Sequence, residues 1–169
     1  PMQITLHQSL SEIDPKQWSA LTDADFPFAD YAHLRSLESA GCVGVEVGWV
    51  PFYLCIRANS DEKSEILAAT YFYIKNNSYG EFIFDHAWAQ AYARSGVPYF
   101  PKAVSAVPFT PATGNKILVR SGQSRTQMEK ILIQKTLEVA QSLKCSSVHF
   151  LFIPEQSVPS FESQKGENK

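Results

Sequence analysis

The chain has 169 residues, of which 44% are hydrophobic and 19% are charged, and its 15 Lys and Arg residues stand against 17 Asp and Glu residues. A net charge of -2 leaves no basic surplus for binding a nucleic-acid backbone. No apolar run approaches the ~20 residues that a membrane-spanning helix needs. These figures argue against a nucleic-acid-binding protein and against an integral membrane protein. They predict one soluble domain with a substantial hydrophobic core.

The N-terminal stretch PMQITLHQSL lacks the positive region, the long apolar run and the cleavage site of a secretory signal, so we expect a cytoplasmic location. Cys42, Cys55 and Cys145 are odd in number and far apart. Their spacing predicts free thiols rather than a disulfide framework or a metal site.

The N-terminal part predicts one strand followed by two helices. Residues 2–7 alternate apolar and polar side chains, which is typical of a strand with one buried face. Residues 14–17 combine an acidic N-cap, a proline at the first helical position and a glutamine three residues after the cap, so a short helix should start there. Asp30 and Gly41 bound a second amphipathic helix.

The middle of the chain predicts an antiparallel hairpin and a third helix. Residues 52–57 and 65–75 are rich in β-formers and are separated by the polar run ANSDEKSE. Asp85 is a candidate N-cap for a third helix, and Gly96 lies just after the last turn of that helix. Residues 102–107 predict a further strand.

The C-terminal part predicts a short strand over 117–120 and the clearest helix of the chain over about residues 127–144. Thr126 and Glu129 have the spacing of a capping box at the start of that helix. Residues 147–153, SVHFLFI, are apolar on both faces and predict a central strand.

The resulting order, β-α-α-β-β-α-β-α-β with an additional short strand before the last helix, indicates an α/β (α+β) fold in which helices cover both faces of a mixed, mostly antiparallel sheet. We expect a single domain over 1–153. Residues 154–169 contain two prolines and show no periodicity, so we expect a disordered tail.

Polar and aromatic chemistry is most concentrated between residues 79 and 111. An aromatic wall that excludes water, with a few placed charges, can orient a polar substrate. The alternative is structural: Asp85 only caps its helix, and Phe84, Trp88 and Tyr92 belong to an ordinary core stripe. The members of this candidate site are Glu81, Asp85, His86, Trp88, Tyr92, Tyr99 and Lys102.

The loop PFTPATGNK, residues 108–116, offers small hydroxyl residues, a glycine and a cation, which can bind a phosphate. The alternative is a plain connecting loop. The residues that would contribute to a phosphate site are Thr110, Thr113, Gly114, Lys116 and Arg120.

Several motifs of enzyme classes are absent, including GxSxG, GxxxxGK[ST], GxGxxG and HExxH. The histidines are scattered, and a lone histidine is more often a packing residue than a catalytic base. They are His7, His33, His86 and His149.

The runs GWVPFYL (48–54), YGEFIFDHAWAQAYARSGVPYFPK (79–102) and AVPFTPATGNKIL (106–118) resemble a group of bacterial peptidoglycan-biosynthesis proteins in the FemAB-like branch of the GNAT acyltransferase superfamily. The resemblance spans about residues 25–153. It implies a GNAT-like fold, and transfer of an acyl group from a thioester, or of an aminoacyl group from tRNA, to an amine. Compared with the two-part proteins of that group, the chain corresponds to an N-terminal half.

Within this resemblance, Glu81 or His86 is the expected base, and Tyr92 or Tyr99 the expected proton donor. Asp85, Trp88 and Lys102 are expected to bind substrate. The five residues proposed above for a phosphate site, between 110 and 120, are expected to bind the phosphates of acetyl-CoA or another acyl-CoA. The sequence Q/R-x-x-G-x-G/A that usually binds coenzyme A directly before a helix is absent.

The expected partners are a small-molecule or peptide-like amine and a second copy of the chain, because an exposed edge beside residues 147–153 would invite pairing. Aminoacyl-tRNA enters only through the resemblance, and no membrane partner is expected. The alternative function is a catalytically inactive binding or dimerisation domain.

Overall fold

A computed structural model describes residues 1–83 and 85–163 of the chain. The strands are β1 (Gln3–His7), β2 (Trp49–Arg57), β3 (Ile66–Lys75), β4 (Lys102–Ser105), β5 (Ile117–Val119) and β6 (Val148–Phe150). The helices are α1 (Pro15–Ser19), α2 (Tyr31–Ser39), α3 (His86–Arg94), α4 (Arg125–Ser142) and α5 (Val158–Glu162), with short 3-10 turns at Leu10–Glu12, Pro27–Ala29 and Glu155–Ser157.

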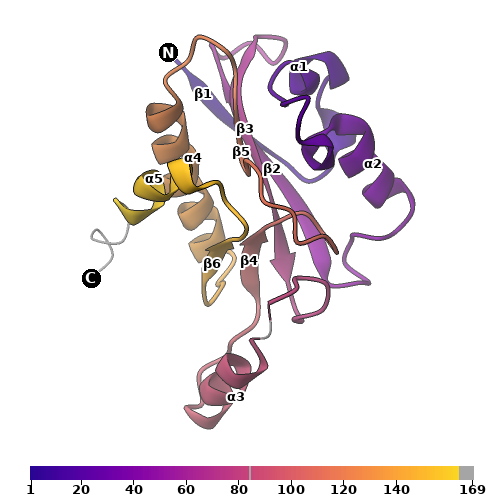
Figure 1. The fold of residues 1–169 in the computed structure, drawn as a ribbon, viewed down its shortest axis with the longest axis vertical. Helices are drawn as coiled ribbons and strands as arrows, with labels where there is room; N and C mark the ends of the chain where they lie inside the picture. Colours follow the sequence, from indigo (N-terminus) through magenta and orange to yellow (C-terminus); the bar gives the residue numbers. More distant parts are fainter. Residues whose placement is uncertain (84, 164–169) are drawn as a thin grey trace.

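All of these strands form one open sheet in the order β1-β2-β3-β4-β6 (Figure 1). Strands β4 and β5 both pair antiparallel with β3, with Lys102 opposite Lys75 and Ile117 opposite Thr70. Strand β6 pairs with β4 in parallel. The mixed, mostly antiparallel sheet expected from the order of elements is therefore confirmed.

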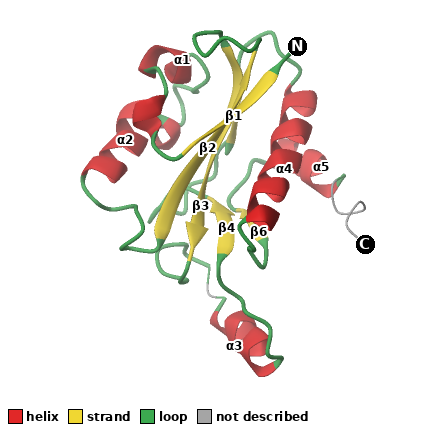
Figure 2. Ribbon diagram, turned by 180° about the vertical axis from the view of Figure 1, so that it is seen from behind, coloured by secondary structure: helices red, strands yellow, loops and turns green. Residues whose placement is uncertain are grey.

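Helices cover both faces of the sheet: α1 and α2 lie on one side, and α4 and α5 on the other (Figure 2). Trp18 of α1 and Leu34 of α2 belong to the apolar cluster on the first face. Leu132 of α4 belongs to the cluster on the second face. Since helices cover it on both sides, every residue of β3 is buried.

Helix α3 differs from the other helices because it projects beyond the end of the sheet (Figures 1 and 2). None of its residues is buried. The apolar residues of this helix therefore do not enter either core cluster, which contradicts the interpretation of Trp88 and Tyr92 as part of an ordinary core stripe. Phe84, the third residue of that predicted stripe, lies outside the described residues.

The predictions for β6 and for the start of α4 are corrected. Strand β6 lies at the end of the sheet, not at its centre. Val148 and Phe150 pack on the α4 side, whereas His149, on the other face, lines a cavity. Only one face of the strand is therefore apolar. The predicted capping box is also wrong: Ser124 caps α4 by accepting from the Gln127 amide.

The segment expected to be a disordered tail instead contains α5. Ser157 and Ser160 donate to the buried carboxylate of Glu129, with oxygen–oxygen distances of 3.2 and 2.5 Å, and Phe161 contacts Phe150. These contacts hold α5 on α4, while residues 164–169 lie outside the described part of the chain.

Among the described residues, no helix combines the length and the apolar character needed to cross a bilayer.

Candidate active site

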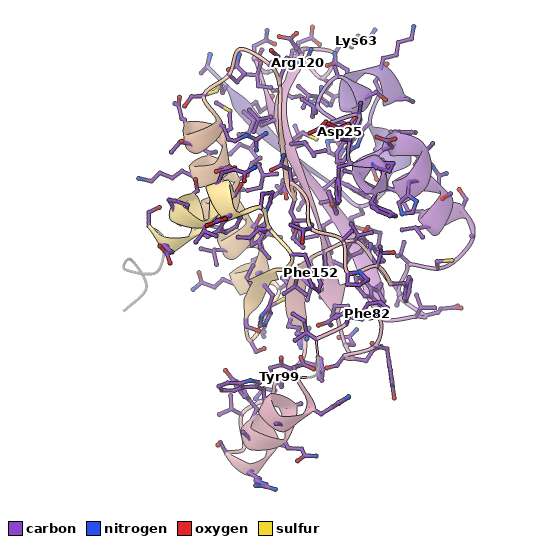
Figure 3. All side chains as sticks on the ribbon, in the orientation of Figure 1. Asp25, Lys63, Phe82, Tyr99, Arg120 and Phe152 are labelled. Atoms are coloured by element: carbon purple, nitrogen blue, oxygen red, sulfur yellow. The ribbon has the colours of Figure 1, made fainter. Side chains whose placement is uncertain are left out.

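A cavity of about 360 Å³ lies where α3 faces the sheet, and we call it the α3 cavity. The linker before α3, the helix itself, the start of β4 and the end strand β6 all contribute to it. Its lining residues are Glu81, Ile83, Asp85, Trp88, Tyr92, Tyr99, Lys102, Ser147, His149 and Leu151. Figure 3 shows Tyr99 between α3 and the sheet.

Lys102 is the central cation of the α3 cavity. As the first residue of β4 it is fully buried, and its Nζ lies 2.7 Å from Oε2 of Glu81 and 2.6 Å from Oδ2 of Asp85. An ammonium group has three N–H donors. Two of them serve these carboxylates, and the third has no acceptor among the described residues.

The position of Glu81 is determined by the end of the β2–β3 hairpin. The Nζ of Lys75 donates to the Tyr79 carbonyl at 2.6 Å and lies 3.8 Å from the centre of the Trp49 ring. Trp49 Nε1 donates to the same carbonyl at 3.1 Å. These bonds fix the chain two residues before Glu81, and so place its carboxylate beside Lys102.

The two oxygens of Glu81 have different surroundings. Oε2 accepts from Lys102, whereas Oε1 is buried with no hydrogen-bond partner among the described residues and lies 3.8 Å from Nζ of Lys75. Burial raises the pKa of Glu81, and the hydrogen bond from Lys102 opposes that rise. The site therefore holds a carboxylate oxygen that can accept a proton or a donor from a ligand.

Asp85 precedes α3 at the N-cap position, but its side chain makes no cap hydrogen bond. Instead, Oδ2 accepts from the Tyr99 hydroxyl at 2.5 Å and from Lys102. Burial alone would raise the pKa of Asp85, but these hydrogen bonds outweigh it and lower the pKa to about 2. Asp85 is thus a permanent anion that holds Lys102 and Tyr99 in place.

Aromatic rings from α3 and from the segment before β4 form the outer wall of the cavity. Trp88 remains 67% exposed. The rings of Tyr92 and Tyr99 make an edge contact, with centroids 5.2 Å apart. Such a wall can contact an apolar stem or the face of a cation.

His149 and Ser147 line the cavity from β6 and from the residue before it, and neither was among the predicted site residues. The Ser147 Oγ lies 2.8 Å from Nε2 of His149. Burial, followed by the charge of Lys102, lowers the pKa of His149, so its imidazole is neutral at pH 7. The alternation of Ser147 and His149 with Val148 and Phe150 is the sequence signal that could have indicated this polar face.

The structure brings all of the predicted 81–102 residues together in this cavity except one. His86, the first residue of α3, is exposed and does not line the cavity. Its place as the alternative base to Glu81 therefore has no geometric support.

The predicted phosphate residues are arranged differently from the expectation. Lys116 is 1% exposed, and its Nζ donates to the carbonyls of Ala112, Gly114 and Phe152. Arg120 donates to the Ile66 carbonyl and to Gln17, and pairs with Glu65. Neither cation is free to bind a phosphate.

The remaining members of that set do not supply the missing charge. Thr113 is exposed, and Thr110 and Gly114 are half-buried in the same loop. Figure 3 shows Arg120 at the opposite end of the sheet from Tyr99. The residues present here do not fit the pyrophosphate of coenzyme A.

Comparison with known proteins gives a family and a fold. A family model described as FemAB_like, peptidoglycan biosynthesis/recognition, matches residues 9–168. An acetyltransferase of Trypanosoma brucei is similar over 100% of this chain and 94% of its own, with 14% identity and a TM-score of 0.53.

The aminoglycoside 6'-N-acetyltransferase AAC(6')-Ih of Acinetobacter baumannii is similar over 100% of this chain and 92% of its own, with 13% identity and a TM-score of 0.50. Both likenesses show the fold. Among curated proteins, no sequence matches the chain.

Proposed function

Since the chain belongs to the FemAB_like family, and is an N-acyltransferase-like domain of the FemAB/GNAT type, we propose that the α3 cavity is where it transfers an acyl or aminoacyl group to an amine. The observation that carries the proposal is the buried side chain of Glu81, which lines the cavity: Lys102 holds its Oε2, and its Oε1 has no hydrogen-bond partner among the described residues. The family and the fold favour this function over an inactive binding domain.

The acceptor amine is protonated at pH 7 and must lose a proton before its nitrogen can attack a carbonyl carbon. Glu81 is suited to that task because burial raises its pKa towards the working pH, which makes it a better base than an exposed carboxylate. The ammonium group of the acceptor would donate to Oε1 of Glu81, and the carbon chain that carries it would lie against the aromatic wall.

Attack on the acyl carbonyl moves negative charge onto its oxygen. The third N–H of Lys102, which has no acceptor among the described residues, can stabilise this oxyanion in a site largely shielded from water. Tyr99 already donates to Asp85 and so is a positioning residue. Tyr92 lines the cavity and is the candidate that returns a proton to the leaving group.

The donor is proposed only as an activated acyl ester or thioester. The fold is that of acetyltransferases, which favours acyl-CoA, and the family resemblance adds aminoacyl-tRNA. The engagement of Lys116 and Arg120 argues that any phosphates bind outside the 110–120 loop. The acceptor is proposed as a small-molecule or peptide-like amine.

The test is a two-way screen of the full chain, with acetyl-CoA and aminoacyl-tRNA as donors and a panel of primary amines as acceptors, followed by mass spectrometry of the products. We expect an amide product that depends on enzyme, donor and acceptor. Glu62→Gln, which changes an exposed carboxylate in the turn between β2 and β3, is the matched control and should leave the yield unchanged. No amide from any donor and amine pair would contradict the proposal.

A further inference from the structure

Ser147 and His149 form a hydrogen-bonded pair that the direct transfer described above does not use. Their Oγ and Nε2 atoms lie 2.8 Å apart, within the roughly 2.6–3.2 Å expected of a nucleophile and its base. Both residues are half-buried, and both line the α3 cavity. The pair is therefore shielded, yet open to a ligand in that cavity.

Ser147 also lines a second cavity, of about 460 Å³, between the last turns of α4 and residues 145–148. Among the residues that line these two cavities, it is the one that they share. A donor and an acceptor placed on the two sides would both approach Ser147.

We propose that Ser147 is the nucleophile of a double-displacement transfer and that His149 is its base. The Ser147 oxygen bonds to the acyl carbon, its proton passes to Nε2 of His149, and the thiol or alcohol of the donor leaves with that proton. The amine, having given one proton to Glu81, then attacks the acyl-serine ester. Its second proton passes to Nε2 of His149 and from there to the Ser147 oxygen, which leaves as the amide forms. The acceptor half of this sequence rests on the proposed function, and Glu81 serves there as base.

The surroundings of the pair fit this direction of proton transfer. The Ser146 hydroxyl donates to the Tyr99 carbonyl, and its oxygen lies 3.4 Å from the Ser147 oxygen, which is too long to compete with His149. The Ser147 proton is therefore directed to Nε2 when His149 carries its own proton on Nδ1.

The charges near the pair also support the two steps. Burial and the Lys102 charge keep His149 neutral and able to accept a proton, while Asp85 favours the imidazolium that forms. The free N–H of Lys102 is available to the oxyanion in both half-reactions.

The test uses the full chain with two reagents that need no amine: a fluorophosphonate, which labels activated serines, and p-nitrophenyl acetate, which leaves an acetyl group on the nucleophile. We expect one adduct, located by tandem mass spectrometry on Ser147. Ser147→Ala should abolish it, and His149→Asn should slow it by at least about 100-fold, the effect of losing a general base. Ser142→Ala removes a hydroxyl that bonds within α4 and should label at the wild-type rate.

Wild-type protein that carries no label on Ser147, or Ser147→Ala that transfers acetyl to amines at the wild-type rate with an unchanged melting temperature, would overturn the inference. In the second case, transfer is direct and the proposed function stands. Acetylation of Ser147 in a protein that acylates no amine would support the nucleophile and contradict the proposed function. The two proposals can therefore fail separately.

Discussion

Lys75 and Lys102 lie directly opposite each other in the antiparallel pairing of β3 and β4, and both are fully buried. Like charges in such positions repel. Glu81 lies 3.8 Å from the first ammonium and 2.7 Å from the second, and Asp85 adds a second anion beside Lys102. The four groups balance in charge, and that balance makes a polar cavity stable at the end of an apolar sheet.

Replacing Lys102 by methionine is expected to destabilise the protein strongly. Glu81 and Asp85 would stay buried with Lys75 as the only nearby cation among the described residues, and breaking a buried ion pair typically costs about 3–5 kcal/mol. Urea unfolding followed by circular dichroism measures the change. Lys135→Met, which removes an exposed partner of Glu138, should leave the unfolding curve unchanged, and equal curves for the two variants would contradict this account.

Asp85 predicts a loss of stability in acid. Its pKa is about 2 in the folded protein and 3.8 ordinarily, so the folded state binds fewer protons in this window, and the free energy of unfolding falls as the pH falls from 3.8 to about 2. Glu81, whose pKa is raised, acts in the opposite sense near its own titration. Asp85→Asn should have a shallower decline than the wild type over this range; parallel declines would refute the assignment.

Lys116 predicts a gain of stability in mild alkali. Burial lowers its pKa from 10.5 to about 8, so unfolding takes up a proton between these values and the free energy of unfolding rises with pH. Lys75 contributes in the same sense. Chemical denaturation of Lys116→Met at pH values between 8 and 10 should show a smaller rise than the wild type, and an unchanged rise would rule out a buried ammonium at this position.

Two tryptophans should respond in opposite ways to replacement by alanine. Trp18 is 0% exposed and donates to the Ala29 carbonyl, so Trp18→Ala should cost about 3–5 kcal/mol of stability. Trp88 is mostly exposed on α3, so Trp88→Ala should leave the melting temperature nearly unchanged and raise KM for the amine. An unaltered KM would remove Trp88 from the acceptor site.

The attachment of α5 depends on Glu129. Ser160→Ala removes a 2.5 Å hydrogen bond to this buried carboxylate, and such bonds to charged groups contribute about 1.5–3 kcal/mol. Amide hydrogen exchange should accelerate in α5 before it accelerates in the sheet. Ser39→Ala, on the exposed surface of α2, is the matched control, and equal exchange in α5 of both variants would contradict the role of Glu129.

Local signals in the sequence predicted the helix ends well, because the capping role of an N-terminal aspartate or a C-terminal glycine depends only on the neighbouring backbone. Asp14 accepts from the amides of Lys16 and Gln17 as an N-cap should, and Gly41 and Gly96 adopt the positive φ of helix ends. Glu129 was predicted wrongly. Its spacing from Thr126 is that of a capping box, but its carboxylate accepts hydrogen bonds from Ser157 and Ser160, and local sequence does not reveal this distant contact.

The site was predicted in part for the same reason. Glu81, Asp85 and Lys102 are close in sequence, so a local cluster pointed to them. His149 reaches the cavity only because β6 pairs in parallel with β4, where it lies opposite Val104. The loop that contains Lys116 has the composition of a phosphate-binding loop, but the Lys116 ammonium donates to three backbone carbonyls instead. Homodimer formation stays a prediction.

The rate of amide formation by Glu81→Gln, compared with the wild type, tests the central claim most directly. Glutamine keeps the shape of the side chain and an oxygen for Lys102, but it cannot accept the proton of the amine. We predict a fall of at least about 100-fold in the rate, as for loss of a general base, with a folded protein by circular dichroism. A folded Glu81→Gln protein that transfers at the wild-type rate would contradict the claim that the α3 cavity performs the reaction through Glu81.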